Sequence, residues 1–190
     1  MKKSKLWFSN NPKSAVLVYI VSKYKETSTN QLGRTIMQKI CYFLKFVESD
    51  IPLPYSFTLY NYGPFSQDLL SDIDLLKADR LIEDNSPQPE VSDYQASSNS
   101  AEFLRSFDAK LTPFKKSIDA IVQMVGKLNA TDMELFATTH YIFWAYKNFD
   151  QRPPGKQKVV DKVYEIKERK FSKEQITHAF DEIKRVGMLG

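Results

Sequence analysis

The chain has little of what most catalytic and redox sites are built from. Among its 190 residues there are one cysteine and two histidines, and the six glycines are scattered singly. A single cysteine excludes an internal disulfide and fits a reducing compartment. The sequence contains neither a glycine-rich phosphate loop nor the GxSxG turn of many hydrolases. The two histidines have no Cys or His at metal-ligand spacing, so we expect no enzymatic activity, no cofactor and no bound metal.

Buried, unreactive roles are predicted for two of these rare residues. His140 shares the apolar face of a predicted helix with Met133, Phe136 and Trp144, which is typical of a core histidine. Cys41 lies in the middle of a predicted helix between Ile40 and Tyr42, which favours a buried, inert thiol.

Long apolar runs are also absent. The longest one near the N-terminus covers seven residues, 15–21, whereas a membrane-spanning helix needs about 18. Hydrophobic residues nevertheless make up 42% of the chain and aromatic residues 13%, which is typical of a globular protein. We therefore expect a cytoplasmic protein that does not enter a membrane.

Charge is divided unevenly along the chain. Residues 1–45 contain nine Lys/Arg and one acid, whereas residues 46–108 contain three Lys/Arg and twelve Asp/Glu. The basic N-terminal region could contact nucleic acid, although lysines on a helix usually form a solvated face. Asp68, Asp72 and Asp74 form an acidic cluster that could hold a cation, but a solvated acidic face is the more frequent outcome of such a pattern.

Helical periodicity dominates the chain and predicts a mainly α fold with a small antiparallel sheet. Helices are predicted from residue 12 to about 25, over 32–48, 66–79 and 112–129, and from 131 to about 149, with smaller ones over 157–168 and 173–186. The stretch 55–62 alternates like a strand, and residues 80–97 read as a hairpin. The linker DQRPPGK divides the chain into one domain, residues 1–150, and a C-terminal helical appendage, residues 151–190.

Helix ends give more specific predictions. Asn11 followed by Pro12 fits an N-cap with proline at the first helical position. Ser66 can cap the helix that follows it, Thr112 can cap the next long helix, and Thr131 with Glu134 matches a capping box. The last helix is predicted to start at a box formed by Ser172 and Gln175 and to stop at Gly187.

The order helix, helix, strand, helix, hairpin is similar to a winged-helix unit. A nucleic-acid-binding regulator is therefore the main alternative function. In that reading helix 66–79 would enter the major groove, but it contains Asp68, Asp72, Asp74 and Asp79 against Lys77 alone. Because DNA binding depends on neutralising phosphates, DNA recognition through this helix is unfavourable. A weaker third hypothesis is a hydrolase that uses the acidic cluster with a divalent cation.

Two segments carry a resemblance to a known family. GRTIMQKICYFLKFV, followed by LPYSFTLYNYGPFSQDLLSDIDLLKADRLIE, resembles the Panacea domain, the SocA-like antitoxin and proteolytic-adaptor family, and in particular its uncharacterised bacterial and archaeal relatives. The resemblance covers roughly residues 30–85. It departs from the antitoxin pattern upstream of the turn, where Leu59-Tyr60 replaces a common tryptophan. It implies a non-catalytic protein that binds a partner protein, such as a toxin or a protease substrate. A homo-oligomer is compatible with it.

The segment LYNYGPF is the candidate interaction site. Gly63 and Pro64 are predicted to form a structural turn, in which Gly63 supplies a backbone angle that side chains disfavour and Pro64 lies near a helix start. Tyr60, Asn61 and Tyr62 cannot all face inward on one short strand, and rigid tyrosine-rich turns are favoured in protein interfaces. Gln38 and Lys39 are predicted on the polar side of helix 32–48. If the strand and this helix pack through Leu59, Ile40 and Phe43, those five polar residues would border one another at the surface as the partner-binding site.

Overall fold

A computed structural model describes residues 7–88 and 90–189 of the chain. Over these residues the fold is mainly helical and contains two small antiparallel sheets, which confirms the predicted fold class. The winged-helix order predicts one small sheet. In the described part of the chain, however, β1 (Thr58–Tyr60) pairs with β2 (Gly63–Phe65), and β3 (Ile82–Asp84) pairs with β4 (Tyr94–Ala96). The stretch around Gly63 and Pro64 is thus a strand, which the sequence pattern had not predicted.

The chain forms two compact units, and their boundaries differ from the predicted ones. The first unit contains residues 1–56 and 66–127, and the second contains residues 57–65 and 128–190. The predicted boundary at residue 150 is therefore wrong. The helix before the linker packs with the two helices after it, because their apolar faces cover one another.

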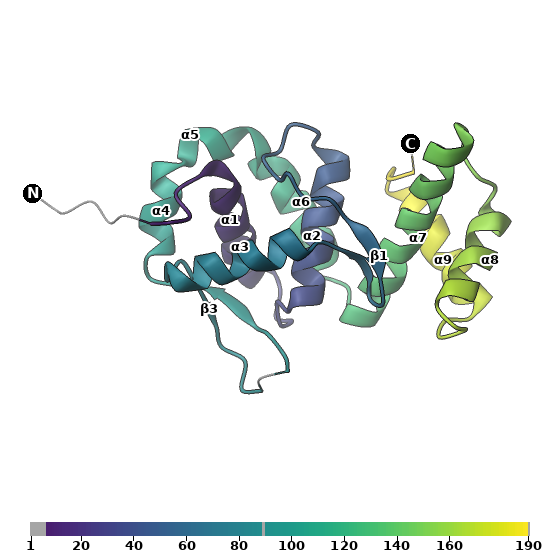
Figure 1. The fold of residues 1–190 in the computed structure, drawn as a ribbon, viewed down its shortest axis with the longest axis horizontal. Coiled ribbons are helices and arrows are strands. Elements are labelled where there is room, and N and C mark those ends of the chain that lie inside the picture. The colour runs from purple at the N-terminus through teal and green to yellow at the C-terminus, as the bar shows by residue number, and fades with distance from the viewer. Residues whose placement is uncertain (1–6, 89, 190) are drawn as a thin grey trace, which may run out of the picture. The chain divides into compact units, whose positions relative to one another are not determined.

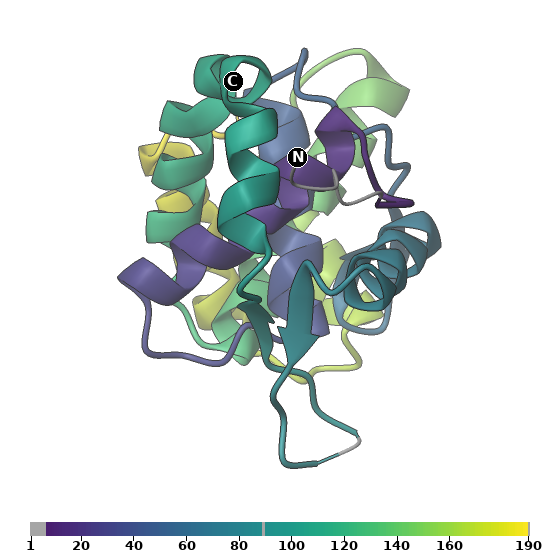
Figure 2. The ribbon, with the colours of Figure 1, turned by 90° about the vertical axis from the view of Figure 1, so that its left-hand side faces the viewer.

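Helix α1 (Pro12–Thr27) is the core of the first unit. Asn11 caps it by accepting a hydrogen bond from the Ser14 amide, and Pro12 occupies the first turn, as predicted. Its residues 15–18, 20, 21 and 24 are completely buried. Around it pack α3 (Gln67–Ala78), α4 (Ser100–Ser106), α5 (Asp108–Leu111) and α6 (Lys115–Val125), with a 3-10 turn at Thr112–Phe114 before α6 (Figure 2). Helix α2 (Arg34–Val47) packs on α6.

The β3–β4 hairpin extends from the helices of the first unit (Figure 1). It confirms the hairpin predicted for residues 80–97. Ile82 and Tyr94 are buried, whereas Glu83 and Asp84 are exposed. The hairpin base packs on α1 and α3.

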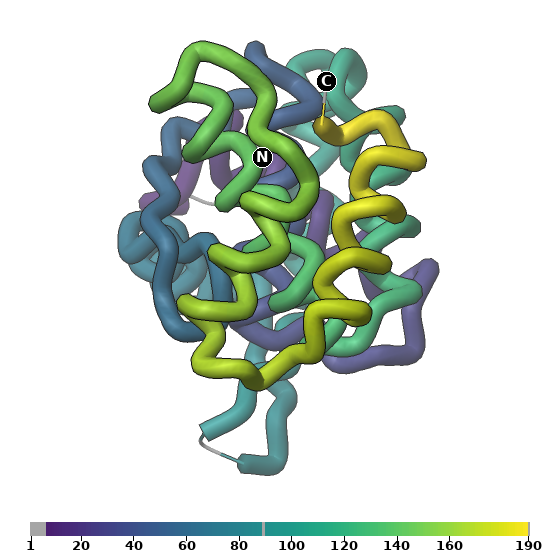
Figure 3. Tube along the Cα trace, turned by 90° about the vertical axis from the view of Figure 1, so that its right-hand side faces the viewer, coloured from purple at the N-terminus to yellow at the C-terminus, as the bar shows by residue number. Residues whose placement is uncertain are grey.

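Helices α7 (Ala130–Asp150), α8 (Lys156–Ile166) and α9 (Lys173–Arg185) form the body of the second unit (Figure 3). Residues 133–140 of α7 are buried on consecutive positions, so this helix is central to the unit. Strand β2 packs on α7, so the β1–β2 hairpin belongs to this unit.

Some predicted helix ends are confirmed and others are wrong. The capping box of Ser172 and Gln175 is present, and Gly187 ends α9 with a φ of 77°. The box predicted for Thr131 and Glu134 is not formed, because Asn129 caps α7 one residue before its first turn. Thr112 donates its hydroxyl backwards to Asp108 instead of capping, and the side chain of Ser66 makes no capping bond.

Among the described residues, no helix is long and apolar enough to cross a membrane.

Candidate functional site

The tip of the β1–β2 hairpin, residues 60–63, is the candidate site, and we call it the tyrosine hairpin. Tyr60 pairs with Gly63, which leaves Asn61 and Tyr62 as the two residues of the turn. Gly63 has a φ of 93°, and a left-handed residue after such a turn is typical of three-residue hairpin loops. The predicted need for glycine at this position is confirmed.

Pro64 does not lie at a helix start as expected. It is the central residue of β2, opposite Leu59, and it is buried. Because proline has no amide hydrogen, this position cannot donate to the hairpin ladder, and the ring fixes the backbone of the strand instead. The turn therefore joins two strands, and α3 begins only at Gln67.

The two tyrosine rings of the hairpin are exposed. Tyr60 retains 62% of its accessible surface and Tyr62 retains 60%. The Tyr60 ring lies against Phe65 on the opposite strand, with ring centroids 5.6 Å apart. Tyrosine presents a large amphipathic surface with few rotatable bonds, so its side chain loses little entropy when a partner binds.

A buried ion network supports the hairpin from below. The Lys167 ammonium donates to the Asn61 carbonyl at 2.6 Å and to the Glu134 carboxylate at 2.9 Å. The side chains of Lys167 and Glu134 are 6% and 4% exposed. Lys170 binds the second oxygen of Glu134 at 2.9 Å and places its ammonium 5.7 Å from the centre of the Tyr62 ring. The tip is thus fixed by side chains from α7 and from the connection between α8 and α9.

The connection between α8 and α9 has a strained backbone conformation. Glu168 and Arg169 both have positive φ, 48° and 65°, in two consecutive non-glycine residues. Each such residue costs on the order of 1 kcal/mol relative to an ordinary conformation. The contacts of Lys167 and Lys170 with Glu134 help to offset this cost, because they fall on either side of the two strained residues.

Gln38 and Lys39 are not part of an exposed patch. Both are 2% exposed, so the prediction that they lie at the surface is wrong. The side-chain oxygen of Gln38 accepts a hydrogen bond from the Ser66 backbone amide at 2.9 Å, and its side-chain nitrogen donates to the Ser66 carbonyl at 2.8 Å. It satisfies both backbone groups of a buried residue next to α3, which is a structural role. Gln38 and Lys39 belong to the first unit and the tyrosine hairpin to the second. The predicted packing through Leu59, Ile40 and Phe43 stays a prediction.

The acidic cluster of α3 is divided among separate partners. Asp72 accepts from the buried Tyr55 hydroxyl and pairs with Lys13, both at 2.7 Å. Asp74 pairs with Lys77 on the same helix. Within residues 7–88 and 90–189, no group of three or more His, Cys, Asp or Glu is arranged to hold a metal ion.

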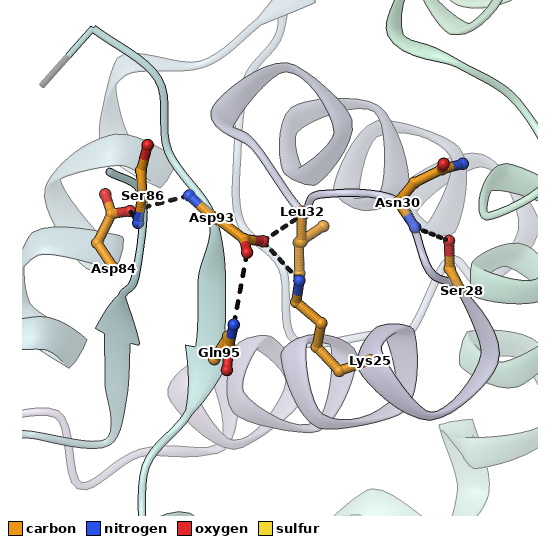
Figure 4. Close-up of polar contacts among 8 residues, drawn as sticks. All are labelled: Lys25, Ser28, Asn30, Leu32, Asp84, Ser86, Asp93 and Gln95. Carbon is orange, nitrogen blue, oxygen red and sulfur yellow. Dashed lines mark hydrogen bonds and ion pairs between the residues drawn. The ribbon is translucent and has the colours of Figure 1, made fainter. Parts of the chain in front are cut away.

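A second polar cluster lies at the base of the β3–β4 hairpin and is structural (Figure 4). The Asp93 carboxylate accepts from the Lys25 ammonium at 2.5 Å and from the Leu32 amide at 3.1 Å, while the Asp93 amide donates to Asp84. Partial burial raises the pKa of the Asp93 carboxyl, but the hydrogen bonds from Lys25 and Leu32 outweigh it, and the pKa lies below its usual value. Asp93 thereby joins α1, the segment before α2 and the hairpin.

The predicted burial of His140 and Cys41 is confirmed. Both are completely buried. His140 Nε2 lies 3.1 Å from the Met188 carbonyl and 2.9 Å from the Trp144 indole nitrogen. Burial lowers the pKa of His140 to about 4, and burial raises the pKa of the Cys41 thiol. These side chains are core groups.

Glu134, Lys167 and Lys170 are the site residues that sequence reasoning missed. Glu134 was predicted to cap a helix, and the two lysines lie near a helix end where lysine is ordinary. One signal was available: Glu134 falls among consecutive apolar residues of α7, and a buried carboxylate needs a cation. Nothing in the sequence identifies which cation that is.

Comparison of the sequence with models of known protein families gave no match, and comparison with curated proteins gave none.

Proposed function

We propose that the protein is a non-catalytic, cytoplasmic protein-interaction module, antitoxin-like or adaptor-like, and that the tyrosine hairpin is its partner-binding surface. The observation that carries the proposal is the pairing of two exposed tyrosines with a buried support. Tyr60 and Tyr62 keep about three fifths of their surface accessible, while the carbonyl of the residue between them is held by the buried Lys167.

This combination lowers the cost of association. A turn fixed by Gly63 and Pro64 and held by Lys167 has little conformational entropy left to lose on binding. Exposed aromatic side chains also supply most of the binding energy in many interfaces. The exposed three fifths of these two rings add no buried apolar surface to the fold, so binding is the use that this geometry favours.

The family resemblance supports the same proposal. The tyrosine, glycine and proline of the shared turn are Tyr62, Gly63 and Pro64, which form the tyrosine hairpin and its second strand. A Panacea-like protein would use such a surface to neutralise a toxin or to deliver a protease substrate. We propose this relationship on the motif residues alone.

The test is affinity capture from the native cell with three tagged proteins. These are the wild type, a Tyr60→Ala/Tyr62→Ala variant and a Phe149→Ala control. Phe149 is an 86% exposed aromatic in the last turn of α7, so the control removes an exposed ring of the same unit outside the hairpin. Circular dichroism and thermal unfolding first establish that all three are folded.

The proposal expects one stoichiometric protein partner that is retained by the wild type and by Phe149→Ala and lost by the tyrosine variant. A Tyr60→Phe/Tyr62→Phe variant keeps the rings and should retain most of the binding. Identical captured proteins from all variants would show that the hairpin is architecture alone. Capture of nucleic acid in place of a protein would favour the regulator hypothesis.

A further inference from the structure

The surroundings of the tyrosine hairpin carry an excess of positive charge. Glu134 pairs with two ammonium groups, Lys167 on one carboxylate oxygen and Lys170 on the other. Of the described residues, Glu134 is the only acid within ion-pair distance of either lysine. One carboxylate neutralises one of these cations, so one positive charge remains. Exposed Arg169 and Glu168, which lie between the lysines, cancel one another.

The remaining charge lies beside an exposed ring. Lys167 is buried, whereas the Lys170 side chain is 46% exposed. Its ammonium lies 5.7 Å from the centre of the Tyr62 ring and 5.3 Å from that of Phe171. The accessible surface at the tip is thus an aromatic ring next to a half-exposed cation whose carboxylate partner is shared.

From this arrangement we propose that the tyrosine hairpin and Lys170 together dock an acidic segment of the partner protein, with a carboxylate at Lys170 and an apolar side chain on the tyrosine rings. This inference rests on the proposed function and adds the chemistry of the partner. An acidic side chain of the partner would neutralise the positive charge that remains after Glu134 has paired with the two lysines. An adjacent apolar side chain would cover the exposed tyrosine rings.

A polyanion such as nucleic acid fits this surface less well. Residues 57–65 and 128–190 contain eleven Lys/Arg and nine Asp/Glu, and many of these lysines pair with carboxylates of the same unit. Nucleic-acid binding depends on neutralising several phosphates at once. One excess charge at the hairpin suits one carboxylate of a peptide.

The test uses selection of random peptides displayed on phage against the full chain, followed by fluorescence anisotropy with the most enriched peptide. We expect peptides rich in Asp and Glu that also contain an apolar residue. Lys170→Gln should weaken binding of that peptide by about two- to fivefold, the range for one exposed ion pair. Lys156→Gln is the matched control, because Lys156 has the same 46% exposed side chain and also pairs with one carboxylate, Asp181.

Each outcome decides between the inference and the proposed function. Suppose the selected peptides are neutral or basic, no longer bind Tyr60→Ala/Tyr62→Ala, and bind Lys170→Gln with unchanged affinity. That result would overturn the inference of an acidic segment and leave the proposed function standing. Peptides whose affinity changes neither with Lys170→Gln nor with Tyr60→Ala/Tyr62→Ala would overturn both the inference and the proposed function. The absence of any enriched peptide would do the same. A single-stranded oligothymidylate that binds and depends on Lys170 would assign the surface to nucleic acid and also overturn the inference.

Discussion

The Lys167 ammonium lies 2.6 Å from the carbonyl oxygen of Asn61, although 106 residues separate the two in the sequence. The same ammonium lies 2.9 Å from Glu134, so one buried cation joins the hairpin turn to α7. The exposed tyrosines next to Asn61 are therefore positioned by a charge pair beneath the surface.

Breaking this pair should destabilise the protein more than replacing it. Lys167→Met leaves the Asn61 carbonyl without its donor and Glu134 buried with one cation fewer, and we expect a loss of about 3 kcal/mol in the free energy of unfolding. The double variant Glu134→Leu/Lys167→Met also removes the carboxylate, which Lys170 alone would otherwise pair with, and should recover about half of that loss. Urea denaturation measures both values. A double variant no more stable than Lys167→Met would contradict the predicted coupling.

Gly63→Ala should cost about 1 kcal/mol or more. The φ of 93° at this position is strained for any residue with a β-carbon. Gly155→Ala is the control, because Gly155 has a φ of −64° and nothing lies within 4 Å of an added β-carbon. It should change stability by no more than about 0.5 kcal/mol. Equal denaturation midpoints for Gly63→Ala and the wild type would mean that the glycine is incidental.

Replacing the left-handed residue at two helix ends with glycine should stabilise the protein. In α3, α8 and α9 the helix closes with the same pair of backbone hydrogen bonds around a left-handed residue, which is Arg80, Glu168 and Gly187 respectively. Only α9 uses glycine there. Arg80→Gly and Glu168→Gly should each stabilise the protein by about 0.5–1 kcal/mol, seen as a higher midpoint in thermal unfolding. A lower midpoint for both would show that these side chains contribute more than the strain costs.

His140 should make stability depend on pH. Its pKa is lowered to about 4 by burial, from 6.5, so in this window the unfolded chain binds a proton that the folded chain excludes. The contribution is fully present above the unfolded pKa and is lost as the pH falls towards 4. Between about pH 7 and about pH 5 the loss is about 2 kcal/mol.

The pH effect is separated from that of other groups by a pair of substitutions. His140→Gln should remove this part of the pH dependence, even if it lowers stability at all pH values. His178→Gln, at an exposed position of α9, is the matched substitution of the other histidine. The same slope between pH 7 and pH 5 in His140→Gln and the wild type would rule out His140 as its source.

Local signals predicted the helices well and the pairing of segments less well. Asn11-Pro12 and Ser172 with Gln175 mark helix starts through bonds within one turn, so the sequence contains all the information needed. The strand at Gly63–Phe65 was missed because glycine and proline both disfavour strands, and only the contact with Leu59 and α7 reveals it.

The candidate site was predictable only where local sequence signals decide the position of a residue. The exposure of Tyr60 and Tyr62 follows from how few side chains a short strand can bury. The burial of Gln38 depends on Ser66, whose backbone groups need a partner 28 residues away. Lys167 and Glu134 find one another only in the folded chain, and no spacing in the sequence encodes that pairing.

The most direct test of the tyrosine hairpin as a partner-binding surface is hydrogen exchange of the protein alone and with its captured partner. The account predicts that bound partner slows amide exchange in residues 57–63 and in the connection 167–171, and leaves the β3–β4 hairpin unchanged. Slower exchange confined to the β3–β4 hairpin or α3, with residues 57–63 exchanging as in the free protein, would contradict it.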